Sequence, residues 1–288
     1  MIAGFDPRGD GQHGGQLVTD AIPGTTGSVI YWRLSGEVEV AELAQKWEDL
    51  GLDAALLPGR PSPAVALRRA MGAQKEKHLL VRGVKGAHFL VRERLGADEP
   101  EYEPELKVTL NAGGLPAFDK PGHAACPTLR AAFGAQLDAL DDTDVSCWLV
   151  KMARHLDAVP LRDSGGVYFV PAHRVFEMMR MREALDRASY CRIHALPAAR
   201  SEEVVAAVID AVTTAVEAEA KAIEVELATP MKARALETRK ERLAAEHARV
   251  SRYEALLGVK LVSLRGTVEL VEQQACLAAL TLAQDEEE

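Results

Sequence analysis

The chain of 288 residues contains few aromatic side chains, only four cysteines and no long apolar run. Aromatic residues make up 5% of the total, whereas Ala, Leu, Val and Glu abound, which favours helix over sheet. Because no apolar run approaches the roughly 18 residues that a membrane-spanning helix needs, we expect no membrane span. The scattered cysteines are not typical of a disulfide framework, so the sequence predicts a reducing, cytoplasmic setting.

Residues 1–27 lack a hydrophobic period and also lack the basic and apolar segments of a signal peptide. They are rich in Gly, Asp, Thr and Pro, which predicts a flexible leader. The last four residues, 285–288, predict an acidic tail. The net charge of −9 opposes long-range attraction to nucleic acid, although basic residues outnumber acidic ones in 51–96 and 145–200.

The pattern of residues 28–112 predicts a small α+β unit with a winged-helix-like layout. β-branched and aromatic residues favour a strand over 28–34. A helix follows, whose apolar face is formed by Val40, Leu43, Trp47 and Leu50. Ser62 and Pro63 predict a second helix, because Ser is a favoured N-cap and Pro fits the first helical position.

A β-hairpin over 78–94 is predicted to complete this unit, with an acidic loop over 97–105 and a further strand over 106–110. Residues 113–141 contain Gly, Pro and Asp in a pattern typical of a connector.

Residues 142–200 predict a second α+β unit in which a helix is again followed by a hairpin. The helix carries a full apolar stripe formed by Val145, Trp148, Leu149, Met152 and Leu156. The hairpin is predicted over 159–170, because Gly165 and Gly166 separate two β-rich runs and can supply the positive φ angles of a tight turn.

Residues 201–284 differ from the rest and predict long helices with a coiled-coil-like seam. Ser201 marks the start of the first helix, and the pair Thr229–Pro230 separates it from the second. Along the second helix an apolar residue recurs every seven positions, at Leu236, Leu243, Val250 and Leu257. Whether Gly258 ends this helix is left open. The predicted fold class is therefore α+β, with winged-helix-like units followed by a C-terminal helical hairpin or bundle.

Two Cys/His couples offer the donors of a tetrahedral zinc site: His123 with Cys126, and Cys191 with His194. In a strand, however, Cys191 and His194 would face opposite sides. Because Cys and His often lie near each other by chance, buried cysteines are the favoured interpretation, and we predict no metal and no cofactor.

Known catalytic motifs are lacking. The chain has no G-x-S-x-G elbow, no P-loop, no G-x-G-x-x-G fingerprint and no H-E-x-x-H pair. The acidic cluster of Asp141, Asp142 and Asp144 lies where a helix N-terminus attracts carboxylates, so we interpret it as capping. We assign no catalytic residue.

Basic side chains near the hairpins are candidates for contact with nucleic-acid phosphates. They are Arg68, Arg69, Arg82, Lys85, Arg92, Arg94 and Arg162. Phosphate binding would need several of these charges on one face. In the alternative interpretation, they neutralise the acidic segments of the same chain.

Two stretches carry a family resemblance, namely Gly27–Gly36 and Leu156–Pro171. Together with the long helical C-terminal region, they resemble a family of uncharacterised bacterial and phage proteins of unknown function. The resemblance spans roughly residues 27–280 and implies a mobile-element or accessory bacterial context, but no activity. The layout of wing-like units joined to helices is also similar to that of the winged-helix subunits of bacterial condensin-type complexes, a likeness of layout alone.

The leading functional hypothesis is a non-enzymatic binding or assembly protein of a bacterial or phage system. Residues 201–284 would associate with a protein partner or a second copy. The runner-up is a nucleic-acid-binding protein that uses the basic hairpins, and the third hypothesis is an enzyme with an unrecognised site. An apolar seam left uncovered on the helices would favour the first, and a basic stripe shared by both hairpins would favour the second.

Overall fold

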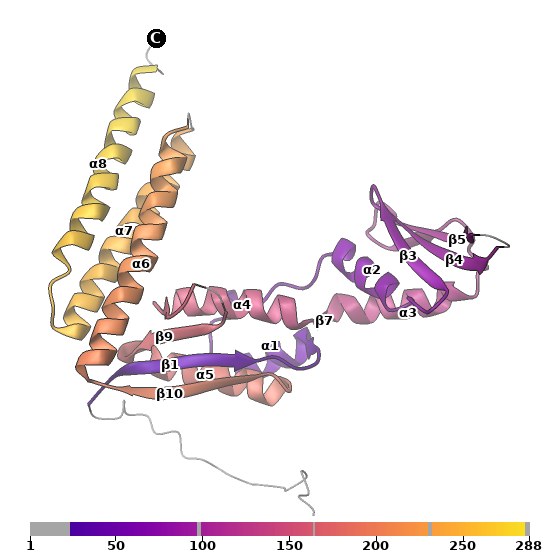
Figure 1. Ribbon diagram of the computed structural model, residues 1–288, viewed down its shortest axis with the longest axis horizontal. Coiled ribbons are helices and arrows are strands. Elements are labelled where there is room, and N and C mark those ends of the chain that lie inside the picture. Colours follow the sequence, from indigo (N-terminus) through magenta and orange to yellow (C-terminus); the bar gives the residue numbers. More distant parts are fainter. Residues whose placement is uncertain (1–23, 97–98, 164, 230–231, 286–288) are drawn as a thin grey trace, which may run out of the picture.

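The computed structural model describes residues 24–96, 99–163, 165–229 and 232–285. Buried apolar side chains form three clusters. They belong to three parts of the molecule that Figure 1 shows side by side: a distal unit, a central body and a helical bundle, with the central body in the middle. The predicted α+β class, with antiparallel sheets and C-terminal helices, is confirmed.

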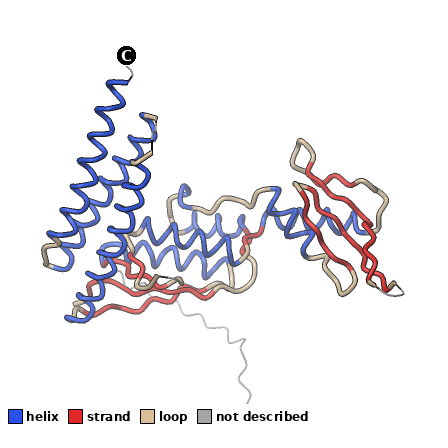
Figure 2. The backbone as a smooth tube through the Cα atoms, turned by 45° about the horizontal axis from the view of Figure 1, so that its top comes forward, coloured by secondary structure: helices blue, strands red, loops and turns tan. Residues whose placement is uncertain are grey.

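The central body is built on an antiparallel sheet in the order β10-β1-β9-β8. Its strands are β1 (Thr25–Arg33), β8 (Val159–Pro160), β9 (Val167–Pro171) and β10 (Arg192–Ala199). Its helices are α1 (Val40–Asp49), α4 (Asp142–His155) and α5 (Ala172–Ala188). Figure 2 shows the helices along one face of this sheet. The first strand in the chain therefore lies in the interior of the sheet, between strands that come much later.

The predictions for the first strand and the first helix are confirmed. Leu43 and Trp47 point into the core, as the helical spacing indicates. Gly51 follows α1 with a φ of +60°, the left-handed conformation that commonly ends a helix. The indole nitrogen of Trp47 donates a hydrogen bond to the carbonyl oxygen of Asp53 at 2.8 Å, which fixes the chain beyond the helix.

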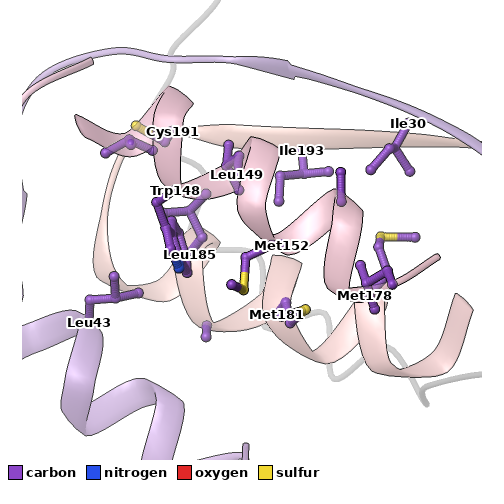
Figure 3. Packing of buried hydrophobic residues seen from close by; sticks show 14 of the residues in the cluster. Ile30, Leu43, Trp148, Leu149, Met152, Met178, Met181, Leu185, Cys191 and Ile193 are labelled. Carbon is purple, nitrogen blue, oxygen red and sulfur yellow. The ribbon is translucent and has the colours of Figure 1, made fainter. Parts of the chain in front are cut away.

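The core of the central body forms where α4 and α5 meet the sheet. Trp148, Leu149 and Met152 of α4 lie near Met178 and Met181 of α5 (Figure 3). The apolar stripe predicted for this helix is thus its buried side. The cavity between these side chains has a volume of only about 20 Å³, roughly the room of one water molecule. This core is therefore packed and offers no ligand site.

The hairpin predicted over 159–170 is present as β8 and β9, but its two glycines have different roles. Gly165 has a φ of +91°, as expected for the turn. Gly166 has no positive φ, which corrects the prediction for that position. A Cβ atom on Gly166 would lie 2.4 Å from the ring of Trp32, so close packing against the indole requires glycine there.

The distal unit is a four-stranded antiparallel meander covered by two helices. Its strands are β3 (Leu79–Val84), β4 (Ala87–Leu95), β5 (Pro100–Leu110) and β6 (Pro116–Phe118). The helices are α2 (Pro63–Gly72) and α3 (Ala125–Asp138). The hairpin predicted over 78–94 corresponds to β3 and β4, and its turn has positive φ at Lys85 and Gly86.

Two expectations for this region differ from the structure. Most of the acidic loop expected over 97–105 belongs to β5. The connector expected over 113–141 contains β6, α3 and the short strand β7 (Ala139–Leu140), which pairs with β2 (Val38–Glu39). Helix α3 is obscured in the sequence by Pro127, which lies in the first turn, where proline is tolerated.

The unit expected over 28–112 contributes to two hydrophobic clusters. Its first part, β1 and α1, packs in the central body, whereas α2 and the β3–β4 hairpin pack in the distal unit. A short helical turn, η1 (Ala54–Leu56), lies between them, and its Leu56 carbonyl accepts a hydrogen bond from the indole of Trp148 at 2.8 Å. The hairpin continues into β5 and β6, so it is part of a larger sheet rather than an isolated wing.

The C-terminal region forms a three-helix bundle of α6 (Glu202–Leu227), α7 (Ala233–Leu257) and α8 (Val262–Asp285). Ser201 caps α6 by accepting a hydrogen bond from the Val204 amide at 3.3 Å. Gly258 has a φ of +69° and ends α7, which settles the question left open by the sequence.

Some sequence predictions lie outside the described residues. The predicted leader over 1–27 lies mostly outside them, although its residues 25–27 belong to β1. Pro230, of the predicted helix boundary Thr229–Pro230, also lies outside them, as does the acidic tail beyond residue 285. Among the helices described, none has the length and apolar character needed to cross a membrane.

Candidate functional site

The two Cys/His couples do not come together. Cys126 is buried in the core of the distal unit, and Cys191 is buried in the core of the central body. His123 accepts a hydrogen bond from the Ala125 amide at 3.2 Å, next to the start of α3. His194 is exposed on the central sheet, on the opposite side of its strand from the apolar core. Within the described ranges, no three His, Cys, Asp or Glu side chains are grouped as metal ligands.

Two basic residues of the β3–β4 hairpin are neutralised by the neighbouring strand. Arg92 binds Glu105 with two hydrogen bonds, one of them 3.1 Å between Nη2 and Oε2. Arg94 lies 2.8 Å from Glu103. The hydrogen bond from Arg92 lowers the pKa of the Glu105 carboxyl, so this carboxylate stays charged beside it. The acidic residues of β5 therefore neutralise these basic residues of β4.

The other basic candidates are spread over different surroundings. Arg69 is largely buried and binds Asp141 at 2.7 Å and Asp144 at 2.8 Å. Arg82 and Lys85 are exposed and, in the part of the chain that the structure describes, form no salt bridge. Arg162 lies on the second hairpin, in the central body, and Arg68 is exposed on α2. Among the described residues no basic stripe joins the two hairpins, because one belongs to the distal unit and the other to the central body (Figure 1).

The acidic cluster before α4 acts as predicted for a helix N-terminus. Asp141 accepts a hydrogen bond from the Asp144 amide at 2.9 Å, and Asp144 in turn accepts one from the Asp141 amide. This reciprocal pair is a capping box. Because both carboxylates also bind Arg69, the cluster joins α4 to the distal unit.

A buried charged group joins the bundle to the central body. Asp157 follows α4 with a φ of +56° and accepts a hydrogen bond from Arg252 of α7 at 2.6 Å. The hydroxyl of Tyr253 donates to the Asp157 carbonyl at 2.7 Å, and burial raises the pKa of that hydroxyl. Burial also raises the pKa of Glu246, although the nearby positive charge of Arg249 lowers that pKa in part. Asp157 pairs with Arg252 and Tyr253 across the joint, whereas Glu246 and Arg249 pair within α7, and both arrangements indicate a structural role.

The seam predicted along the C-terminal helices is buried inside the bundle. Val212 and Val216 of α6 and Val250 of α7 are inaccessible to solvent, and α8 contributes Val268 and Val271 to the same cluster. The seam is therefore closed within one chain.

The outer face of α8 carries a second heptad pattern that the sequence analysis missed. We call it the α8 outer stripe; it consists of Ser263, Gly266, Leu270, Gln273, Leu277 and Leu280, all exposed. The three leucines expose 56%, 64% and 63% of their surface. The spacings of 3, 4, 3, 4 and 3 follow a coiled-coil seam, and none of the six residues is charged. Its signal in the sequence is the leucine spacing of 270, 277 and 280.

The outer faces of the other two helices are polar by comparison. Arg242 of α7 binds Glu219 and Glu226 of α6, the former at 2.7 Å, and Arg239 also binds Glu226 at 2.7 Å. These ion pairs bridge α6 and α7 at the surface. The α8 outer stripe is therefore the apolar side of the bundle and our candidate functional site.

The comparisons with known proteins give one match. A family model described as a family of unknown function, DUF6744, matches residues 26–286. This match includes both stretches that carry the family resemblance in the sequence, and it confirms a family of unknown function. Neither a curated protein nor a solved structure matches the chain.

Proposed function

The chain belongs to DUF6744, a family of unknown function, and we propose that it is a non-enzymatic assembly protein that pairs with a second copy of itself through the α8 outer stripe. The observation that carries this proposal is the uncharged heptad of exposed residues on a helix whose inner seam is already closed. The resemblance seen in the sequence adds a bacterial or phage setting to the proposal.

A second copy is the occupant that fits the stripe best. A seam of coiled-coil spacing packs against another helix with the same spacing, and the chain's own copy provides one of matching length. Because the stripe carries no charge, its copy meets no repulsion along the seam in either orientation. The flanking Glu269 and Glu272 lie beside the stripe, where they remain in contact with water.

The expected affinity is modest. Burying the exposed part of three leucines on each copy contributes on the order of 6–10 kcal/mol in total. Association costs about 4–15 kcal/mol in lost freedom of motion, which is of similar size. The net free energy of association is therefore small, and we expect a weak dimer that forms reversibly, with a dissociation constant no tighter than about 40 µM.

Sedimentation velocity over protein concentrations from about 10 µM to about 1 mM, a range set by this weak affinity, tests this proposal. The test variant is Leu270→Glu with Leu277→Glu, which places two charges in the stripe. The matched control is Val225→Glu, an equally exposed apolar position on α6. We expect dimers of the wild type and the control, and monomers of the test variant.

The proposal is wrong if the wild type stays monomeric throughout this range, or if the double variant dimerises as readily as the wild type. Circular dichroism of each variant shows whether the bundle is intact, since the substituted positions are exposed and should not affect helix content.

A further inference from the structure

The central sheet has one face that is only half covered. Ile30 and Ile193 point to the face that packs against α4 and α5. On the opposite face, Phe169 and Ala198 are buried against the bundle, with Val29 packed beside them. The bundle covers only the end of the sheet at which β1 begins. The remaining end of this face is exposed.

The exposed end is formed by β1 and β10. Tyr31 lies directly opposite His194, and Arg33 lies directly opposite Arg192, in the antiparallel register. Side chains two residues apart on a strand share a face, so these four lie on the same side. Leu196, which is 56% exposed, continues the row. We call these five residues the open sheet patch.

The two aromatic rings of the patch stack on each other across the neighbouring strands. The rings of Tyr31 and His194 are stacked, with their centroids 4.8 Å apart and an angle of 20° between the planes. Tyr31 is 40% exposed, and Tyr190, just before β10, is 78% exposed. Since the chain has only five tyrosines, two exposed ones at this end of the sheet are a notable concentration. Such rings can stack with the bases of a single strand.

The charge of the patch is positive. Like charges directly opposite each other across two strands destabilise a sheet, and Arg33 with Arg192 is such a pair. Arg192 is partly compensated, because it donates to the carbonyl oxygens of Ser189 and Cys191 at 2.7 Å and lies 3.8 Å from Asp186. Arg33 is exposed and has no salt bridge in the described ranges. Arg33 is therefore the charge of the patch that a bound phosphate would meet.

We propose that the open sheet patch binds single-stranded nucleic acid, with bases stacked on Tyr31 and His194 and a phosphate beside Arg33. A single strand fits better than a duplex, because its bases are free to stack on an exposed aromatic ring. The net charge of −9 also opposes a duplex more strongly, since a duplex carries the denser charge. This site is independent of the α8 outer stripe.

Fluorescence anisotropy with labelled oligonucleotides of about 20 nucleotides, long enough to cover a single-strand site, tests the proposal. The probes are oligo(dT), oligo(U) and a DNA duplex of the same length, at about 50 and about 150 mM salt. We expect both single strands to bind more tightly than the duplex, and more weakly at the higher salt. Replacing Tyr31 and His194 by Ala should weaken binding about tenfold or more, the usual loss for a stacked base.

Two comparisons separate recognition from folding. Tyr31→Phe keeps the ring and should keep the affinity, whereas Tyr31→Leu keeps only apolar bulk and should lose it. Arg33→Glu should weaken binding at low salt. The matched control is Arg82→Glu with Lys85→Glu on the distal hairpin, which should bind like the wild type.

Three results would overturn the proposal. The first is no binding of either single strand by the wild type at about 50 mM salt, where phosphate contacts are strongest. The second is duplex binding as tight as single-strand binding. The third is a loss of binding in the hairpin variant but not in the Tyr31 and His194 variant, which would assign the contact to the distal hairpin.

Discussion

The central body is joined to its two neighbours in different ways. At the bundle, Val159, Phe169 and Ala198 of the sheet lie in the same hydrophobic cluster as the seam of the helices. At the distal unit, the side-chain links are polar, chiefly the ion pairs of Arg69 with Asp141 and Asp144. One joint is a shared core, whereas the other combines these ion pairs with the short β2–β7 pairing between separate cores.

This difference predicts how the molecule responds to stress. Where two parts of a protein contribute side chains to one hydrophobic core, unfolding of one part exposes the apolar side chains of the other. Ion pairs between two closed cores give much weaker coupling, because partly exposed pairs contribute little. We therefore expect the bundle and the central body to unfold together, and the distal unit to open separately.

The largest effect should come from the shared core. Phe169 is fully buried, and its ring lies 6.4 Å from that of Tyr253 in α7. Phe169→Ala should lower the free energy of unfolding by about 3–5 kcal/mol, because it leaves a cavity between sheet and bundle. Denaturant unfolding followed by tryptophan fluorescence and by helix circular dichroism measures both parts.

The matched control for this variant is Tyr102→Ala on β5, an aromatic residue that is 54% exposed and should change stability little. If Phe169→Ala destabilised the bundle alone and left the tryptophan transition unchanged, the two parts would not share a cooperative core.

A smaller effect is expected at the polar joint. Arg69→Ala removes both ion pairs and should cost about 1–3 kcal/mol locally, the range for hydrogen bonds to charged groups. Hydrogen exchange should rise in α2 and at the start of α4 but not in α7. Arg60→Ala is the control, because Arg60 pairs with Asp138 while both side chains are mostly exposed. Equal exchange in the two variants would show that Arg69 does not hold the distal unit.

The smallest effect concerns the turn between α7 and α8. Glu254 accepts a hydrogen bond from the Leu261 amide at 2.8 Å and another from Arg265. These bonds lower the pKa of Glu254 below its ordinary value of 4.5. A lowered pKa in the folded state adds stability above pH 4.5, and this is lost as the pH falls through the lowered value.

Glu254→Gln should therefore melt at a lower temperature than the wild type near neutral pH. The difference between the two melting temperatures should shrink as the pH falls below 4.5, where the unfolded chain is protonated first and the folded carboxyl only at its lower pKa. A difference that stayed constant from pH 7 to acid would show that the charge of Glu254 does not stabilise the turn.

The sequence predicts helix ends well, because the residues that cap or end a helix interact with residues close to them in the chain. Ser62 and Ser201 cap the predicted helices, and Gly51 and Gly258 follow helices in the left-handed conformation that glycine favours there. Such features depend on a few consecutive residues, so the sequence contains all of the relevant information.

Features that depend on distant contacts are not predictable in this way. Gly166 is required by Trp32, which lies on another strand and is remote in the sequence. The pairing of Arg92 with Glu105 depends on the register of β4 and β5, so the basic hairpin looks more positive in the sequence than in the fold. The α8 outer stripe was missed because α8 has two apolar faces, and the hydrophobic spacing of the buried face alone was enough to predict the helix.

The position of β1 has a consequence for how the protein is made. During synthesis this strand emerges early, yet its partners β9 and β10 emerge only after the whole distal unit and α4. The meander of the distal unit needs only successive strands, so it can fold while β1 still has both edges free. The growing chain therefore exposes both edges of this strand until α4 and the later strands have been made.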